Sequence, residues 1–461
     1  MRRISTTTSD HTGHAAMTDL SRPKLTRRLA LLAPLAMAGC STIEDVFVDI
    51  PKPPVPGIRV PVIASTRGLV VDNPRGIKVR LPPPTGRDNW PQPGGSASHE
   101  GGHVQVADQL NQAWSVSIGR SGGYRRKIPA SPVVSNGLVF TIDPNGLVAA
   151  FNLSDGKKVW EFDTTPEDDD NSNIGGGISA DGGVVYIASG RAEVIAVDAS
   201  TGAVKWRQKV IRSGRAGPTI ADGKLFVSLL GNAIVCLNAA DGKRIWSYQS
   251  EQNTTGMLGL PSPAYADGLL VAGFGTGQLV GLRATTGAVV WLDSLASTRS
   301  ENPGDLSAIH GLPVIQDGRV YAVSMGGLMI ALDLRSGRRL WERDIASADT
   351  PWMAGGFLFV LSSDAQLTAI DRIDGSVIWV TQLEKWVNKE RKRDAIFWTG
   401  PVLAGDRLVV IASTSVAQAV SPYTGEVIGE QALSGPAAVA PVVAGGTLLV
   451  LTEDGKMLAL R

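Results

Sequence analysis

The stretch Gly217–Gln249, GPTIADGKLFVSLLGNAIVCLNAADGKRIWSYQ, decides the fold because close copies of it recur along the chain. It holds short apolar runs in which Val, Ile, Leu, Phe and Trp partly alternate with small or polar residues, as in half-buried β-strands. These runs are Pro218–Ala221, Lys224–Leu229, Ala233–Asn238 and Arg244–Tyr248. The Asp-Gly and Gly-Asn dipeptides between them accept the positive φ angles of tight hairpin turns. The stretch therefore predicts four antiparallel strands in about forty residues.

The copies share a marker, a Trp that stands four residues after the Gly of a turn. The pairs of turn Gly and marker Trp are Gly156 and Trp160, Gly202 and Trp206, Gly242 and Trp246, Gly287 and Trp291, Gly337 and Trp341, and Gly375 and Trp379. A seventh unit, Gly400–Gln431, keeps Thr424-Gly425 but has Gly429 where the Trp is expected. We expect the outer strand of this unit to be less well anchored than the others.

The last unit is completed from the other end of the chain. It begins at Ala440 and reaches Arg461, which leaves room for three strands, and Asn111–Ile118 resembles the missing fourth strand, with Trp114 as its marker. Four-stranded repeats of this period indicate a β-propeller, and such a completion leaves no exposed edge. We predict an all-β fold, an eight-bladed β-propeller of four-stranded antiparallel blades over residues 111–461, closed by the N-terminal strand. A solenoid is the alternative, but it needs no such completion.

The N-terminal segment has the composition of a targeting signal. Basic residues, among them Arg27 and Arg28, precede the apolar run Leu29–Ala38, which is too short for a permanent membrane span. Small residues and then Cys40 follow, as in a bacterial lipobox. We predict a lipoprotein signal peptide over 1–39 and lipidation of Cys40, with the translation start left open between Met1 and Met17. Ser41 after this Cys favours an anchor in the outer membrane, facing the periplasm.

Residues 40–110 are expected to form the lipidated Cys, a Pro- and Gly-rich tether and a collar. The group His99, Glu100 and His103 matches no trusted zinc spacing, so we expect a surface loop that packs Trp90 on the propeller. The second Cys of the chain, Cys236, has no partner for a disulfide and is expected to be a buried thiol.

The chain carries few signs of catalysis. A formal net charge of +1 gives no electrostatic case for nucleic acid, and nucleophile-elbow, phosphate-loop and Cys-x-x-Cys motifs are missing. We therefore expect no enzyme, no cofactor and no metal. The acidic run Glu167–Asp170 is interpreted as a solvated loop, with cation binding as the alternative. The basic run Lys385–Arg393 is interpreted as an exposed insertion, with partner binding as the alternative.

The repeat, in forms such as VIAVDASTGAVKW at Val194–Trp206, resembles that of pyrroloquinoline-quinone dehydrogenases. That resemblance implies eight blades. However, the chain lacks the adjacent Cys-Cys pair of those enzymes and the extra length in which they place calcium ligands and a catalytic Asp. A cofactor-free propeller is therefore favoured, and a quinone-dependent dehydrogenase and a periplasmic ligand-binding or sensor propeller are the alternatives.

A closer resemblance, over nearly the whole mature chain, is to the family of the outer-membrane protein assembly factor BamB, in its alphaproteobacterial form. It is carried by the Cys40 lipobox, PGIRVPV at Pro56–Val62, WPQPGG at Trp90–Gly95, GGGIS at Gly175–Ser179, RSGRRLWERDI at Arg335–Ile345, TPW at Thr350–Trp352 and the stretch Thr399–Leu408. The resemblance implies a lipoprotein scaffold subunit of the β-barrel assembly (BAM) complex. Its implied partners are the POTRA domains of a BamA-type barrel subunit and, more weakly, nascent outer-membrane proteins.

The same resemblance implies a partner-binding surface in two loops, Thr255–Leu260 and Leu306–His310. The expected contact residues are Met257, Leu258, Leu260, Ala308, Ile309 and His310. Better-known relatives carry an Arg in the first loop and two Asp in the second, where this chain has Leu258, Ala308 and His310. We therefore expect contact through apolar burial more than through charge. The alternative is that these side chains only pack between blades.

Overall fold

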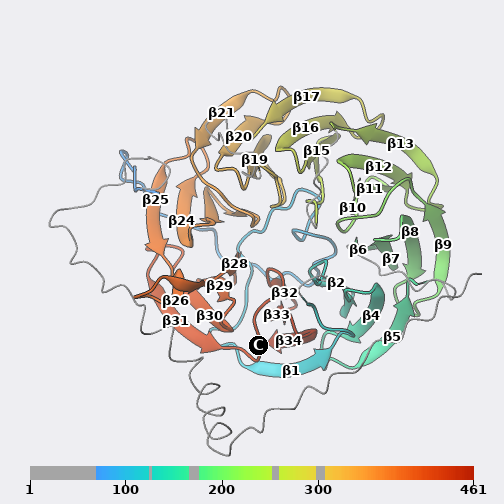
Figure 1. Ribbon diagram of the computed structural model, residues 1–461, viewed down its shortest axis with the longest axis horizontal. Helices are drawn as coiled ribbons and strands as arrows, with labels where there is room; N and C mark the ends of the chain where they lie inside the picture. Colours follow the sequence, from blue (N-terminus) through green and yellow to red (C-terminus); the bar gives the residue numbers. More distant parts are fainter. Residues whose placement is uncertain (1–68, 124–126, 166–175, 252–258, 297–306) are drawn as a thin grey trace, which may run out of the picture. The chain divides into compact units, whose positions relative to one another are not determined.

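The structure is a computed structural model, and the chain divides into the units Met1–Val60 and Pro61–Arg461. The residues that it describes are 69–123, 127–165, 176–251, 259–296 and 307–461. They all belong to the second unit, which holds eight four-stranded antiparallel sheets around one axis (Figure 1). The prediction of an eight-bladed β-propeller is confirmed.

Blades 1 to 7 are meanders whose strands follow one another along the chain from the axis outward. Blade 1 contains β2 (Val133–Ser135), β3 (Leu138–Ile142), β4 (Leu147–Asn152) and β5 (Lys158–Asp163). Blade 2 contains β6 (Gly176–Asp181), β7 (Val184–Ser189), β8 (Glu193–Asp198) and β9 (Val204–Lys209). Blade 3 contains β10 (Thr219–Ala221), β11 (Lys224–Leu229), β12 (Ala233–Asn238) and β13 (Arg244–Gln249). Blade 4 contains β14 (Ala264–Ala266), β15 (Leu269–Gly273), β16 (Gln278–Arg283) and β17 (Val289–Ser294).

The second half of the ring repeats this order. Blade 5 contains β18 (Val314–Gln316), β19 (Arg319–Val323), β20 (Met329–Asp333) and β21 (Arg339–Arg343). Blade 6 contains β22 (Trp352–Ala354), β23 (Phe357–Leu361), β24 (Gln366–Asp371) and β25 (Val377–Gln382), and a separate hairpin follows, β26 (Trp386–Asn388) and β27 (Arg393–Ala395). Blade 7 contains β28 (Trp398–Leu403), β29 (Leu408–Ala412), β30 (Val416–Val420) and β31 (Val427–Ala432). Blade 8 contains β32 (Val442–Ala444), β33 (Thr447–Leu451), β34 (Lys456–Leu460) and β1 (Gln112–Ser117).

The eighth blade joins the two ends of the propeller. Its outer strand β1 pairs antiparallel with β34, so that Ser117 lies opposite Lys456 and Trp114 opposite Ala459. Backbone hydrogen bonds continue this pairing between Asn111 and Arg461 in both directions, at 2.7 and 2.9 Å. The ladder therefore leaves the edge of β34 covered.

The marker Trp residues fasten each outer strand to the next blade. At seven junctions the Trp ring packs against the turn Gly of the following blade, so closely that a Cβ on this Gly would lie within 3 Å of the ring. Each indole Nε1 also donates a hydrogen bond of 2.7 to 3.1 Å to a backbone carbonyl of that blade. The pairs are Trp114 and Gly156, Trp160 and Gly202, Trp206 and Gly242, Trp246 and Gly287, Trp291 and Gly337, Trp341 and Gly375, and Trp379 and Gly425. Gly is required at these turns for both its positive φ and its missing side chain.

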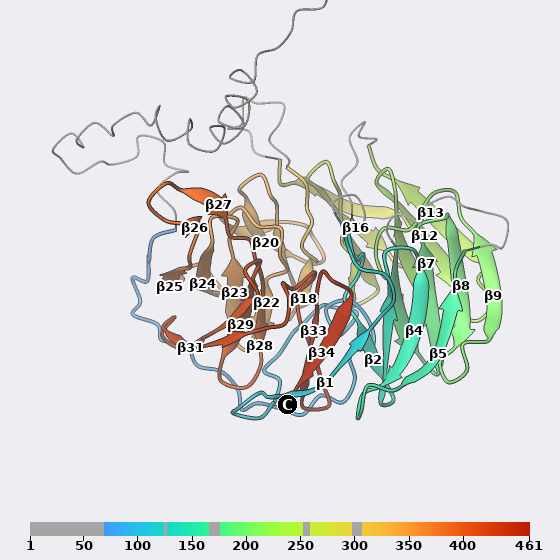
Figure 2. The same ribbon diagram turned by 60° about the horizontal axis from the view of Figure 1, so that its bottom comes forward.

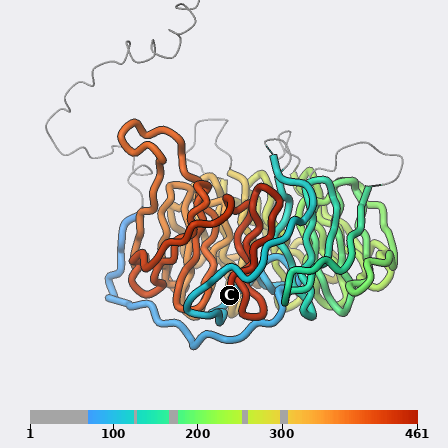
Figure 3. The backbone as a smooth tube through the Cα atoms, turned by 90° about the horizontal axis from the view of Figure 1, so that it is seen from below, coloured from blue at the N-terminus to red at the C-terminus, as the bar shows by residue number. Residues whose placement is uncertain are grey.

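The ring has two different faces. On one face, which we call the connection face, the outer strand of each blade continues into the innermost strand of the next. On the opposite face, which we call the collar face, lie the turns between first and second strands. The described chain, drawn in blue, starts at Leu69 on the outer side of blade 6, where the Asp72 amide donates to the Val377 carbonyl, and then passes over the collar face, whereas β26 and β27 project from the connection face (Figures 2 and 3).

Candidate functional site

Residues 87–105, which we call the collar, close the axis of the propeller on the collar face. They form at least one hydrogen bond with the inner edge of every blade, at 2.7 to 2.9 Å. In chain order the bonded pairs are Arg87 and Gly445, Trp90 and Val134, Pro91 and Ala180, Gln92 and Ile220, Ala97 and Tyr265, Ser98 and Ile315, Gly102 and Met353, and Val104 and Gly405. The sequence predicted a surface loop here, but Trp90 is 4% exposed. The collar is thus part of the core of the ring.

Aromatic stacking holds the collar in place. Trp90 stacks on Trp352, with ring centroids 5.8 Å apart and planes inclined by 12°. Trp352 Nε1 donates a 2.8 Å hydrogen bond to the Gly102 carbonyl, and the neighbouring Gly101 packs so tightly on this indole that a Cβ would lie 2.4 Å from it. The stack therefore joins the two ends of the collar to blade 6.

The two collar histidines serve this packing. His99 Nδ1 lies 2.7 Å from the Pro313 carbonyl oxygen, and burial lowers the pKa of His99 to about 4. Both ring nitrogens of His103 face backbone carbonyls, those of Pro82 at 2.6 Å and Gly405 at 2.8 Å. No group of three or more His, Cys, Asp or Glu side chains able to hold a metal ion occurs within the described ranges.

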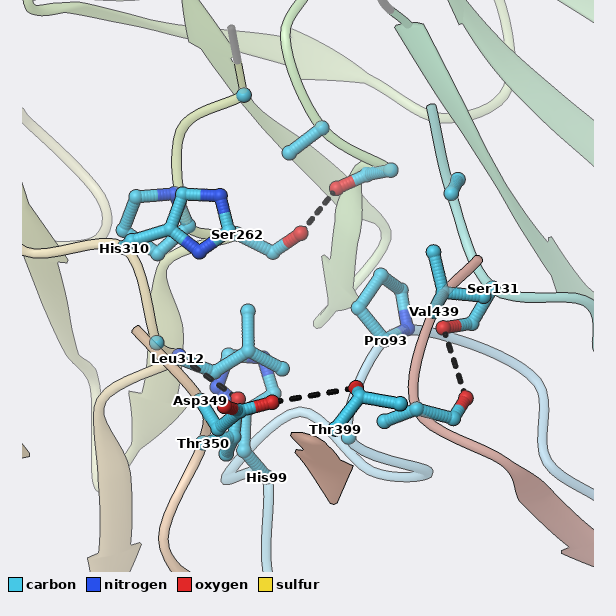
Figure 4. A pocket seen from close by; sticks show the side chains of 18 of the residues that line it. Pro93, His99, Ser131, Ser262, His310, Leu312, Asp349, Thr350, Thr399 and Val439 are labelled. Atoms are coloured by element: carbon cyan, nitrogen blue, oxygen red, sulfur yellow. Dashed lines mark hydrogen bonds between the residues drawn. The ribbon is translucent and has the colours of Figure 1, made fainter. Parts of the chain in front are cut away.

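Above the collar, the axis holds a cavity of about 300 Å³. Its wall is made by the segments that lead into the innermost strands, among them Gly259–Ser262, His310–Leu312 and Ala348–Trp352, and its floor includes Trp90 and His99 of the collar. Figure 4 shows side chains of these segments converging on the cavity. The cavity therefore lies between the collar and the connection face.

One carboxyl group stands out in this wall. Asp349 Oδ1 accepts hydrogen bonds of 3.3 Å from Thr399 Oγ1 and from the Gly400 amide (Figure 4). Burial outweighs these two bonds and raises the pKa of Asp349 to about 7. The side chain therefore changes charge near neutral pH.

Two of the predicted partner-binding residues meet at the rim of the cavity. Leu260 and His310 both line it, and a Cβ on Gly259 would lie 3.4 Å from His310 Nε2. His310 Nδ1 lies 2.9 Å from the Ala348 carbonyl, and the Leu260 amide donates to the Arg215 carbonyl at 3.4 Å. Both side chains are partly exposed.

The other predicted contact residues are either buried or lie outside the described residues. Ala308 and Ile309 are each 1% exposed, and the Ile309 side chain packs against Gly273 in the core between blades 4 and 5. The expectation that Ala308 and Ile309 contact a partner is therefore corrected, because both residues are buried and Ile309 belongs to the core between blades 4 and 5. Met257 and Leu258 lie outside the described residues, as do Cys40 and the acidic run Glu167–Asp170.

Further sequence expectations concern single residues and segments. Cys236 is a buried free thiol, and desolvation raises its pKa to about 12. The basic run forms the exposed hairpin β26–β27. Across the described part of the chain, no helix is long and apolar enough to cross a membrane.

Comparison with known proteins gives one family. Residues 144–381 and 384–461 match the family profile described as "Outer membrane protein assembly factor BamB". A protein of that name from Yersinia pestis is 27% identical over 359 residues, which cover 76% of this chain and 88% of the relative.

Solved structures share the fold. BamB from Moraxella catarrhalis superposes with a TM-score of 0.65 at 21% identity, over 76% of this chain and 99% of that one. Quinohemoprotein alcohol dehydrogenase from Comamonas testosteroni gives a TM-score of 0.61 at 14% identity, over 81% of this chain and 80% of that one. At these identities, the likeness shows the eight-bladed architecture alone.

Proposed function

Because the chain belongs to the family of the outer membrane protein assembly factor BamB, we propose that it acts in the assembly of outer-membrane proteins as a scaffold subunit of the β-barrel assembly complex. Its main partner is the barrel subunit of that complex, a BamA-type protein, bound through its POTRA domains. Contact with nascent outer-membrane proteins is the weaker part of the proposal. A closed ring suits such a role, since its loops present a preorganised surface with little ordering cost on binding.

One observation carries the proposed partner site: Leu260 and His310, from two neighbouring inter-blade connections, share the rim of the axial cavity. With Ala308 and Ile309 buried beneath the second connection, the contact reduces to Leu260, His310 and the residues Met257 and Leu258 of the first. Ile309 then acts indirectly, because its packing between blades 4 and 5 fixes the backbone that carries His310.

We propose that the protein performs no catalysis. The likeness to quinohemoprotein dehydrogenases is confined to the fold. The collar closes the axis on the collar face. The carboxyl group of Asp349 lies in the cavity wall, and among the residues that the structure describes it belongs to no group of three or more His, Cys, Asp or Glu side chains able to hold a metal ion. These residues do not form a set that would hold calcium, which binds through six to eight oxygen ligands.

The protein is further proposed to be held at the periplasmic face of the outer membrane by acyl chains on Cys40. Several chains together hold a soluble domain on a bilayer, at about 0.8 kcal/mol for each buried methylene. Anchoring also restricts the search for the barrel subunit to the membrane plane, which raises the effective concentration of both partners.

The testing experiment is a mild-detergent pull-down of the tagged protein from its own envelope, with mass spectrometry of the eluate and of the N-terminal peptide. We expect the barrel subunit and an acylated Cys40. The variant Leu258→Asp/Leu260→Asp should reduce capture of the barrel subunit at least tenfold, since charge at a desolvated contact costs several kcal/mol.

The matched control is Val427→Asp/Ile428→Asp on β31, which changes two exposed aliphatic residues, 47% and 56% exposed, on an outer strand. It should leave capture unchanged. Equal capture by both variants would move the interface elsewhere, and an eluate without any barrel subunit would contradict the assembly role.

A further inference from the structure

The hairpin β26–β27 is the only strand pair outside the blades in the described part of the chain. It is inserted between blades 6 and 7 and projects beyond the connection face (Figures 2 and 3). Its two strands pair in a short ladder, with Trp386 opposite Ala395 and Asn388 opposite Arg393. Because the hairpin projects outward from the closed ring, it adds nothing to the core of the propeller. Its presence therefore needs another explanation.

The tip of the hairpin is basic and only partly neutralised. Lys389 pairs with Glu384 at 2.5 Å, but no ion pair forms between the next three basic residues and any residue in the described ranges. These are Arg391, Lys392 and Arg393, and all three are exposed. They therefore present positive charge to whatever lies beyond the connection face.

Apolar side chains flank this charge. Phe397 is 74% exposed and Val387 is 59% exposed. The backbone of Phe397 is held on both sides, because its amide donates to Ser413 Oγ at 3.1 Å and its carbonyl accepts from the Ser413 amide at 2.7 Å. The phenyl ring of Phe397 is thus exposed to water although the backbone of this residue is held in place. Aromatic residues beside exposed Lys and Arg are typical of elements that insert into a membrane interface.

The first described residue, Leu69, is bound to the ring near this hairpin. The Leu69 amide donates a 2.8 Å hydrogen bond to Gln366 Oε1. Gln366 lies opposite Gln382, the last residue of β25, and Trp386 of the hairpin follows four residues later. The described chain therefore begins next to the base of the hairpin.

We propose that the hairpin β26–β27, with Arg391, Lys392 and Phe397, is a second membrane contact that binds a bilayer surface containing anionic phospholipid. This inference depends on the proposed Cys40 anchor in one respect only, namely which side of the protein faces the bilayer. The positive charges attract the anionic headgroups. Removal of each basic residue should weaken vesicle binding about fivefold. The Phe397 ring and Val387 then leave water for the interface.

The shape of the hairpin favours a bilayer over a protein partner. The hairpin is a convex projection, and a protein would need a matching acidic groove with an apolar wall to bury it. A lipid surface adapts to the projection and offers both negative charge and an apolar layer. The hairpin lies between blades 6 and 7, whereas the proposed partner site lies on the connections before β14 and β18, so the two sites involve different blades.

The test is co-sedimentation of residues 40–461 carrying Cys40→Ser, so that no acyl chain takes part, with vesicles of phosphatidylglycerol and phosphatidylethanolamine. We expect binding that weakens between 0.05 and 0.5 M NaCl. Arg391→Glu/Lys392→Glu should lower the partition coefficient at least about thirtyfold, and Phe397→Ser about tenfold. Neutral phosphatidylcholine vesicles should bind the unaltered protein weakly.

The control Arg335→Glu/Arg338→Glu makes the same charge change on an exposed turn of the collar face and should bind vesicles like the unaltered protein. Equal binding by the hairpin and control variants would overturn the proposal, as would an unaltered protein that stays in the supernatant. If the hairpin variant keeps its vesicle binding but loses the barrel subunit in the pull-down, the hairpin is a protein contact. Because the vesicle assay contains neither acyl chain nor barrel subunit, its failure leaves the proposed function untouched.

Discussion

At the scale of single residues, the exception to the Trp pattern has a structural reason. A marker Trp docks against the turn that joins the third and fourth strands of the next blade. Blade 7 is followed by blade 8, whose third and fourth strands, β34 and β1, are not joined by a turn because they come from opposite ends of the chain. A Trp at Gly429 would therefore meet no turn Gly, and a groove of about 460 Å³ lies there instead, lined by Leu110 and Gln431.

The loss of this anchor shows in the neighbouring side chains. All six residues of β31 are exposed, whereas the outer strands of other blades bury or half-bury their marker Trp. Gln431 Nε2 donates a 3.2 Å hydrogen bond to the Leu110 carbonyl, which is one polar link at this junction. The outer strand of blade 7 is thus held by its ladder to β30 more than by packing.

Asp349 makes the stability of the ring depend on pH. Its pKa rises from 3.8 to about 7 on folding, so between these pH values the folded state holds a proton that the unfolded state has lost. The free energy of unfolding should therefore fall as pH rises from 4 to 7 and level off above that. For a fully buried carboxyl group, the free energy of unfolding would fall by about 4 kcal/mol over this pH range. Contact of Asp349 with solvent in the cavity makes the fall smaller.

The measurement is urea denaturation of the unaltered protein and Asp349→Asn at several pH values. The amide still accepts hydrogen bonds from Thr399 and Gly400 but cannot ionise. We expect similar stabilities near pH 4.5 and a more stable variant at pH 8. Parallel pH profiles for the two proteins would show that this carboxyl group does not titrate in that range.

At the scale of elements, the collar acts as a ninth component of the ring. Each innermost strand has only one neighbour within its own sheet, so its other edge needs hydrogen-bond partners near the axis. The collar supplies them for the amides of Ala180, Tyr265 and Ile315, among others. This explains how a segment rich in Gly and Pro keeps one path around the axis although it forms no strand of its own.

We predict that Trp90→Ala loosens the collar without opening the blades. Loss of the stack on Trp352 removes a large buried side chain and costs about 3 to 5 kcal/mol. In hydrogen exchange followed by mass spectrometry, peptides that contain Ala180, Tyr265 and Ile315 should exchange faster, and those from middle strands should change little.

The matched comparison is Trp246→Ala, which removes a Trp of similar burial from the outer ring, 8% exposed against 4% for Trp90. Its faster exchange should be confined to blades 3 and 4, which this Trp joins. The same exchange pattern in both variants would mean that the collar has no separate role.

At the scale of the whole propeller, the ring depends on one non-covalent junction between the chain ends, the ladder of β1 and β34. Seven of its eight blades are continuous meanders, whereas the eighth must bring together strands from residues 112–117 and 456–460. Ordering so long a loop costs conformational entropy, which the closed state offsets by covering two edges.

A cross-strand disulfide should relieve this cost. We predict that Ser117→Cys/Lys456→Cys, at paired and exposed positions, raises the free energy of unfolding by about 2 to 4 kcal/mol under oxidising conditions. The background is residues 40–461 with Cys40→Ser, in which the one other thiol, Cys236, is buried. The urea midpoint reports the gain, and reduction should abolish it. If the oxidised and reduced forms unfold together, opening of this junction does not limit stability.

The sequence by itself determined the architecture. The spacing of turn Gly and marker Trp repeats through the chain, and each repeat is a local unit whose strands pair with their neighbours in sequence, so that period and turn chemistry suffice to predict eight blades. The same local logic placed the exposed basic insertion and the buried thiol.

Only the tertiary structure decided which side chains are buried and which segment fills the axis of the propeller. Ile309 is an apolar residue in a connection, and its position in the sequence does not distinguish a surface contact from a core residue, whereas the packing of blade 4 on blade 5 does. The collar has no periodicity, because it forms hydrogen bonds with the inner edges of eight separate blades in turn and not with one ladder. Contacts between residues so distant in sequence arise only once the ring is closed, and they leave no local pattern in the collar sequence.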